Sequence, residues 1–165
     1  MALLLGGLVY AGGVVACPLI EVSPPTEPEK AGYVEMPTAI AAAENMITTL
    51  KTGLEQGYAE FVDESYRTPF INKLEAVLNM LETGNTNGAL MKIRHDLQDK
   101  ELKWVAESSR LTVCYFLEAA AYMLENPART YHIRPLPPGA IARTIEFGCE
   151  VYDGHWHCWI KITFW

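Results

Sequence analysis

Residues 143–165 read RTIEFGCEVYDGHWHCWIKITFW, two runs of strand-forming residues separated by Asp153-Gly154. An Asp-Gly pair suits a type I′ turn, which needs two residues with positive φ, so this stretch predicts a β-hairpin with a two-residue loop. Counting outward from the turn pairs Cys149 with Cys158 at a non-hydrogen-bonded position, where facing side chains are closest. The register therefore predicts a cross-strand disulfide and, with it, an oxidising compartment.

The side chains of this hairpin alternate in polarity, which supports the same register. One face would carry an apolar stripe, made of Ile145, Phe147, Cys149, Val151, Trp156, Cys158, Ile160 and Ile162. On the other face Glu146 pairs with Lys161, and Gly148 lies opposite Trp159, whose ring would cover the glycine. Because a lone hairpin is marginally stable in water, the apolar face is predicted to pack on the rest of the chain.

Residues 37–126 carry apolar side chains every three to four positions, which predicts about four helices. Short loops between them favour a small antiparallel bundle. Residues 127–142 are a proline-containing connector whose residues 130–133 could add an edge strand and make a three-stranded sheet. We therefore predict an α+β fold in which 37–165 is a single domain, with the helical bundle at 37–126 and the antiparallel hairpin at 143–165. Cys114, beside the apolar stripe of the last helix, is predicted to be a buried free thiol.

The first 36 residues are predicted to lie outside this domain. Residues 1–17 are uncharged and apolar, too short for a comfortable membrane span of ~20 residues, and resemble a signal peptide. Val14-Val-Ala-Cys17 resembles the bacterial lipobox, whose cysteine is lipidated; the alternatives are an ordinary export signal or a buried apolar segment. Residues 18–36 contain SPPTEPEK and are predicted to form a stiff tether. Export to the cell envelope or surface, with a lipid anchor at Cys17, follows as the expectation.

Part of the helical region resembles a known family. FINKLEAVLNMLETGNTNGAL, residues 70–90, is similar to the helix–turn–helix centre of FIMAH-type modules, small helical domains appended to secreted and surface proteins of bacteria and archaea. MITTLKTG, residues 46–53, lies where that family has its first helix, and the resemblance spans about residues 40–125. Residues 95–100 and Trp104 depart from the family's more apolar third helix. The resemblance implies an accessory, interaction-type role and carries over no catalytic residue.

The charge balance limits the class of partner. The net charge is −7, with 13 basic and 20 acidic residues and no basic run. This balance argues against nucleic acid or anionic lipid as a partner. Contact with a membrane is therefore expected only through an N-terminal anchor.

Two candidate sites lie on the polar face of the hairpin. Tyr152, Trp159 and Trp165 would offer aromatic rings to a sugar or a protein, although Tyr152 and Trp159 would alternatively just cover Gly148 and the strand edges. His155 and His157 point to one side with Glu150 opposite, a workable three-ligand set for zinc or copper; the alternative is that they are solvated polar residues.

No catalytic motif of high specificity is present, and no catalytic residue is assigned. The sequence favours a non-enzymatic exported or cell-surface module that binds a protein or glycan partner and needs no cofactor. The alternative is a small metal-binding protein, or a metal-dependent enzyme, that uses the face formed by His155, His157 and Glu150.

Overall fold

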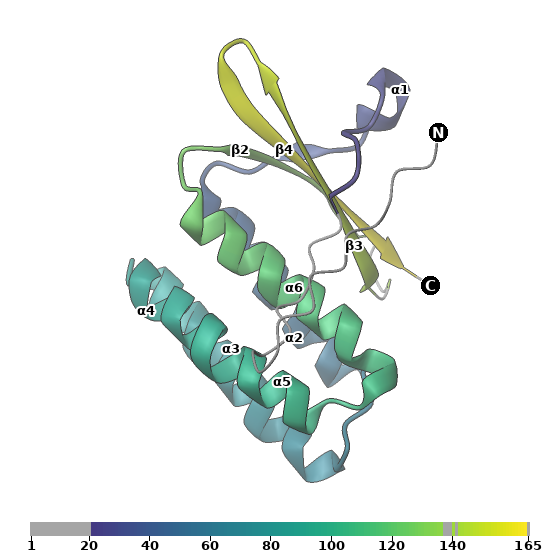
Figure 1. Ribbon diagram of the computed structural model, residues 1–165, viewed down its shortest axis with the longest axis vertical. Coiled ribbons are helices and arrows are strands. Elements are labelled where there is room, and N and C mark those ends of the chain that lie inside the picture. Colours follow the sequence, from purple (N-terminus) through teal and green to yellow (C-terminus); the bar gives the residue numbers. More distant parts are fainter. Residues whose placement is uncertain (1–20, 137–139, 141, 165) are drawn as a thin grey trace, which may run out of the picture.

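The computed structural model describes residues 21–136, 140 and 142–164, which form an α+β fold with a helical layer beneath one mixed sheet (Figure 1). The helices are α1 (Glu27–Lys30), α2 (Ala39–Glu55), a 3₁₀ turn (Glu64–Tyr66), α3 (Arg67–Glu82), α4 (Thr86–Lys92), a π-helical segment (Ile93–Leu97), α5 (Gln98–Trp104) and α6 (Glu107–Glu125). The strands are β1 (Val34–Glu35), β2 (Thr130–Arg134), β3 (Ala142–Tyr152) and β4 (His155–Phe164). The sheet lies on α2 and α6, and α3, α4 and α5 lie on the other side of these two helices (Figure 1).

Helix α6 is the centre of the core. Every residue from Val113 to Ala121 is buried, including one carboxylate, that of Glu118. A helix that is buried all round needs neighbours on every side, and α6 has the sheet on one side and helices on the others. Helix α2 packs beside it with a one-sided apolar stripe and begins at Thr38, whose hydroxyl accepts a hydrogen bond from Ala41 N at 3.0 Å.

The helical run after residue 86 is interrupted by the π-helical segment. Ala89, Ile93, Leu97 and Glu101 are all buried although they are spaced four residues apart. A strict four-residue spacing drifts around an α-helix of 3.6 residues per turn, and a wider π-helical turn corrects that drift. The segment therefore keeps these side chains on one side of the helical run.

The predicted hairpin register is confirmed. Asp153 and Gly154 have φ values of 49° and 76°, as a type I′ turn requires. Cys149 pairs with Cys158, Glu146 with Lys161 and Gly148 with Trp159. Cys149 and Cys158 form a disulfide with a Cα–Cα distance of 4.1 Å. Cys114 is buried, but the prediction that it is a free thiol is wrong, because none of the cysteines described is free.

The hairpin forms as predicted, but the prediction that the sheet consists of this antiparallel hairpin alone, or of three strands, is wrong. The sheet has four strands in the order β1-β2-β4-β3, and β2 runs parallel to β4, so the sheet is mixed. β3 lies at the edge of the sheet, and β4 returns between β2 and β3. β4 buries Cys158, Ile160 and Ile162, and as an inner strand it can satisfy its backbone groups on both sides.

Part of the predicted tether belongs to the folded domain. β1 pairs with β2, and Val22 N donates a hydrogen bond to Phe147 O at 2.6 Å. Residues 1–20, with the predicted leader and the lipidation site Cys17, lie outside the described residues, as does Trp165. Among the helices that the structure describes, none is both long and apolar enough to cross a bilayer.

The tip of the hairpin projects beyond the helical layer (Figure 1). Val151 and Trp156, which were expected in the apolar stripe, are 58% and 48% exposed, and Tyr152 is 70% exposed. The helices end before they reach this part of the sheet, so the last apolar pair of the stripe meets solvent.

Candidate functional site

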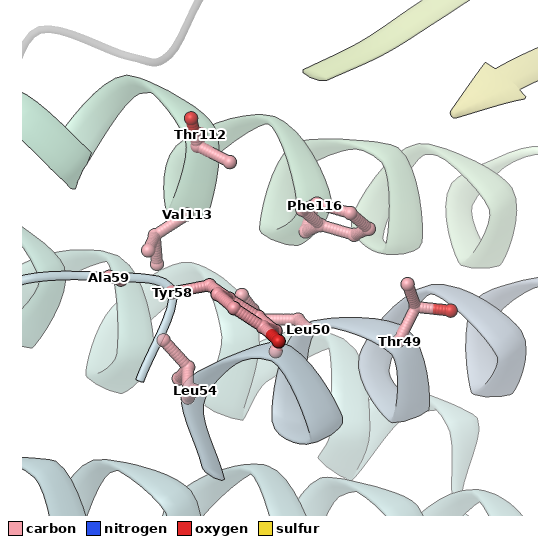
Figure 2. Close-up of a pocket in the computed structure, with 9 residues that line it drawn as sticks. Thr49, Leu50, Leu54, Tyr58, Ala59, Thr112, Val113 and Phe116 are labelled. Atoms are coloured by element: carbon pink, nitrogen blue, oxygen red, sulfur yellow. The ribbon is translucent and has the colours of Figure 1, made fainter. Parts of the chain in front are cut away.

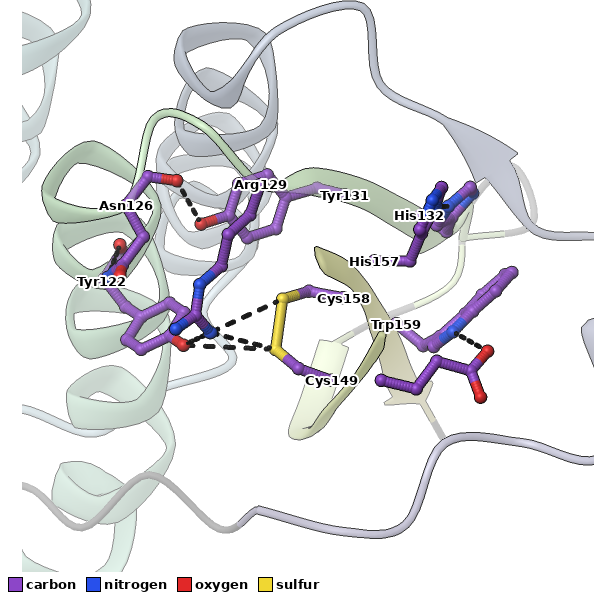
Figure 3. The surroundings of a disulfide bond; sticks show 10 residues. Tyr122, Asn126, Arg129, Tyr131, His132, Cys149, His157, Cys158 and Trp159 are labelled. Carbon is purple, nitrogen blue, oxygen red and sulfur yellow. Dashed lines mark hydrogen bonds between the residues drawn. A yellow bond between two sulfur atoms is a disulfide. The ribbon is translucent and has the colours of Figure 1, made fainter. Parts of the chain in front are cut away.

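A pocket of about 320 Å³ lies on the polar face of the sheet, at its junction with the N-terminal segment. We call it the hairpin pocket; its lining residues are Glu27, Lys30, Glu35, His132, Glu150, Tyr152, His157 and Trp159. The strand register explains why they meet: His132 is paired with Trp159 across β2 and β4, and Glu150 with His157 across β3 and β4. Because side chains alternate along a strand, this pocket and the disulfide lie on opposite sides of β4 (Figure 3).

Trp159 is held by contacts within the protein. Its ring stacks on His132 with centroids 4.0 Å apart, and Lys30 Nζ lies 4.8 Å from its centroid. Its Nε1 donates a hydrogen bond to Glu150 Oε1 at 3.1 Å, and the Tyr33 ring meets it edge-on at 5.5 Å. Trp159 is therefore not an open platform for a ligand.

Tyr152 is the aromatic residue that the pocket presents to solvent. It is 70% exposed and meets His157 edge-on, with ring centroids 5.9 Å apart. Of the three aromatic residues predicted to bind a partner, Tyr152 is thus the one whose ring is available in the part of the chain that the structure describes.

His132 and His157 form a hydrogen-bonded pair, with Nε2 of the first 2.9 Å from Nδ1 of the second. One ring must donate and the other accept, so the pair is complete without an added proton. Burial, and secondarily the neighbouring His157, lower the pKa of His132. Sequence reasoning could not place His132 here, because its position depends on the parallel pairing of β2 with β4.

The predicted metal ligands are not assembled into a site. Glu150 Oε1 lies 2.7 Å from Lys30 Nζ, and this hydrogen bond lowers the pKa of the Glu150 carboxyl. His157 is bonded to His132, and His155 is exposed near the turn. In the described ranges, no group of three or more His, Cys, Asp or Glu side chains is arranged to hold a metal ion. The His155, His157 and Glu150 set is therefore not supported as a zinc or copper site.

The lining of the hairpin pocket has an excess of negative charge. Three carboxylates, those of Glu27, Glu35 and Glu150, face one ammonium group, that of Lys30. Lys30 is paired with Glu150, whereas Glu27 and Glu35 are exposed and make no ion pair with the residues that are described. A cationic group entering the pocket would find two unpaired carboxylates.

The backbone of the N-terminal segment lies against Gly148. A Cβ atom at this position would lie only 2.1 Å from Val22 O and 3.1 Å from Pro24 N. The glycine is therefore needed for the close approach of residues 22–24 to β3. The atoms nearest to this position thus belong to the chain's own backbone, while Trp159 is paired with Gly148 on the neighbouring strand.

Replacing Gly148 with alanine is expected to displace the N-terminal segment, because the three nearest atoms that the new methyl group would meet all belong to the backbone. The Lys30–Ala31 bond should then be cut by trypsin several-fold faster than in the native protein, since proteolysis requires local release of the chain. Gly53→Ala is the matched control, because a Cβ there meets only Tyr58 Cδ2 at 3.9 Å. Equal cleavage rates in the two variants would contradict the packing of this segment.

A second hollow lies between α2 and α6 (Figure 2). Its volume is about 20 Å³, and its lining includes Leu50, Leu54, Val113 and Phe116 but no acid or base. Such a space holds at most one or two water molecules. This hollow is therefore a small packing defect.

Comparisons with protein-family models, curated proteins and solved structures find no match. They neither support nor refute the resemblance to FIMAH-type modules, and the functional assignment rests on the geometry of the hairpin pocket.

Proposed function

We propose that this protein is a non-enzymatic, exported interaction module that binds a positively charged segment of a partner protein in the hairpin pocket. The observation that carries the proposal is the position of the chain's own Lys30. Its ammonium group lies 4.8 Å from the Trp159 ring centroid and 2.7 Å from Glu150 Oε1. An aromatic face beside a carboxylate is the environment that binds ammonium and guanidinium groups.

The charges around Lys30 support a basic partner. Glu27 and Glu35, at the same pocket, make no ion pair with any residue that the structure describes, and the protein as a whole has a net charge of −7. Complementary charge increases the rate of association and disfavours acidic partners. A basic segment therefore fits this surface better than a neutral or acidic one.

The exposed tip of the hairpin supports a protein rather than a glycan. Tyr152 is exposed at the pocket, and Val151 and Trp156 are exposed on the opposite face of the same hairpin tip; exposed aromatic residues of this kind are enriched at protein interfaces. A glycan could not stack on the Trp159 ring, because that ring is already occupied by His132 and Lys30.

Two features of the chain support export, namely the hairpin disulfide and the composition of the first 17 residues. The disulfide between Cys149 and Cys158 is typical of oxidising compartments. The leader-like composition of residues 1–17 points the same way.

Titration with two fluorescent peptides, one rich in Lys and Arg and one rich in Glu, tests the proposal. The basic peptide is expected to bind and the acidic one to fail. Tyr152→Ala and Glu35→Gln should each weaken binding several-fold, whereas Lys30→Gln should strengthen it, because it frees Glu150 and Trp159. Tyr58→Ala, at a 41% exposed tyrosine in the helical layer, is the control and should leave binding unchanged. Binding of neutral oligosaccharides in place of the basic peptide would overturn the choice of partner.

Acidification is expected to weaken binding of the basic peptide. Burial, and secondarily the neighbouring His157, lower the pKa of His132 below its ordinary value, so this ring is neutral near neutral pH and gains a proton only on acidification. The added positive charge then repels a cationic ligand. The dissociation constant should therefore rise between pH 7 and pH 5. It should rise less in a His132→Gln variant, and an equal rise in that variant would contradict a role for the pair.

A further inference from the structure

Both sulfur atoms of the disulfide face a guanidinium group. Arg129 Nη1 lies 3.4 Å from Cys149 Sγ and 3.9 Å from Cys158 Sγ (Figure 3). The same nitrogen donates a hydrogen bond to the hydroxyl oxygen of Tyr122, which is 4.0 Å from Cys149 Sγ. A neutral disulfide is a weak acceptor that gains little from these donors, whereas a thiolate at either sulfur would be strongly stabilised by them.

The positive charge of Arg129 is directed at the sulfurs and is not neutralised by any carboxylate in the described part of the chain. Its guanidinium carbon lies 5.0 Å from the Tyr122 ring centroid and 4.8 Å from that of Trp156, so it sits between two aromatic rings. Among the described residues it forms no ion pair with a carboxylate. An unpaired cation held beside a disulfide favours the reduced, thiolate form of that disulfide.

The two sulfurs differ in access. Cys158 is completely buried on the inner strand β4, whereas Cys149 is only partly buried on the edge strand β3. Cys149 Sγ is therefore the atom that an incoming thiolate would reach, and Cys158 Sγ would be the leaving group beside Arg129.

We propose that Cys149–Cys158 is a thiol–disulfide exchange site in which Arg129 stabilises the thiolate that leaves. A thiolate RS⁻ attacks Cys149 Sγ, the Cys149–Cys158 bond breaks, and Cys158 Sγ departs as a thiolate. A second thiolate attacks the sulfur of R in the mixed disulfide, which releases RSSR and the Cys149 thiolate. In sum, two thiols lose two electrons and two protons, and the protein gains two thiols. The co-reactant is either a small thiol or a dithiol of a partner protein. This inference stands on contacts separate from the hairpin pocket and does not depend on the proposed binding function.

The test uses the oxidised full chain, incubated without oxygen at pH 7 in buffers of stepped glutathione ratio and, separately, with reduced thioredoxin as a protein dithiol. Acid quenching, alkylation and mass spectrometry of the digest report Cys149 and Cys158 separately from Cys114. Native protein should be reduced at these two positions, reversibly, while its circular dichroism stays that of the folded state. Arg129→Gln should react about tenfold more slowly, because the leaving thiolate loses its neighbouring cation. For the same reason, half-reduction of this variant should need a glutathione buffer whose ratio is about tenfold more reducing.

Two further variants keep the test decisive. Arg129→Lys retains the charge and should keep most of the native rate, and Arg134→Gln, at an exposed arginine on β2, should match the native protein. Reaction with glutathione assigns a small thiol as co-reactant, and reaction with thioredoxin alone assigns a protein dithiol. A bond that stays oxidised until the protein unfolds would overturn the proposal. So would equal rates in the native protein, Arg129→Gln and Arg129→Lys, or, if Arg129→Gln does not fold, a tenfold loss of rate in Arg129→Lys.

Discussion

Replacement of Arg94 with methionine is expected to lower the free energy of unfolding by about 3–5 kcal/mol, because it leaves a buried carboxylate without its cation. Arg94 Nη1 contacts both carboxylate oxygens of Glu118 at 2.6 Å, and the Glu118 side chain is only 7% exposed. Gln98 also donates to Glu118, but an amide cannot neutralise its charge. Urea denaturation at pH 7 measures the change.

Two further variants isolate the effect of this pair. Arg94→Met combined with Glu118→Leu should recover most of the lost stability, since no buried charge remains. Lys103→Ala breaks an exposed pair with Asp99 and should change stability by no more than about 1 kcal/mol. If the double variant is as unstable as Arg94→Met alone, the loss comes from packing and the electrostatic explanation is wrong.

Stability is expected to fall as the pH rises from about 4.5 to 7, because of Glu101. This side chain is 1% exposed, and burial raises the pKa of its carboxyl from 4.5 to about 7, with Arg110 opposing the shift. Arg110 Nε is 3.9 Å away, and within the described residues neither this nitrogen nor Glu101 Oε1 has a hydrogen-bond partner. Glu101 is therefore a buried acid with a weak partner.

The sign of this dependence follows from proton binding in the two states. Between pH 4.5 and 7 the folded state keeps the Glu101 proton while the unfolded state has lost it, so raising the pH favours unfolding. The stabilisation is complete below pH 4.5 and absent above pH 7, a difference of up to about 3 kcal/mol.

Glu101→Gln should remove this part of the pH dependence and make the protein more stable than native at pH 8. Glu82→Gln, at an exposed glutamate, is the control. The measurement is the difference in unfolding free energy between variant and native across pH 4–8, which cancels contributions from other groups. A difference that does not change with pH would show that Glu101 is ionised in the folded protein throughout.

The functional surface could be predicted only in part. The alternation of polar and apolar residues places Glu150, Tyr152, His157 and Trp159 on one face of the hairpin, and this face does line the pocket. The residues that complete the pocket, Lys30 and His132, lie about 120 and 25 positions away from Glu150 and His157, as the separations of their hydrogen bonds show. No local pattern connects positions that far apart. The sequence therefore could not show that Lys30 pairs with Glu150 and covers Trp159, or that His132 pairs with His157, so it predicted a metal site and an open Trp159 ring instead.

Local chemistry in the sequence determined the hairpin, its turn, its register and its disulfide. Positive φ at Asp153 and Gly154 sets the turn, and alternation of apolar side chains leaves one register that buries them. The tertiary structure alone decided that β2 lies parallel to β4, that residues 22–24 cover Gly148, and that the hairpin tip is exposed. The physical reason is range: turn geometry and side-chain alternation act over a few residues. Strand order and burial depend on how the whole sheet packs on α2 and α6, where backbone groups and apolar faces distant in sequence must be satisfied together.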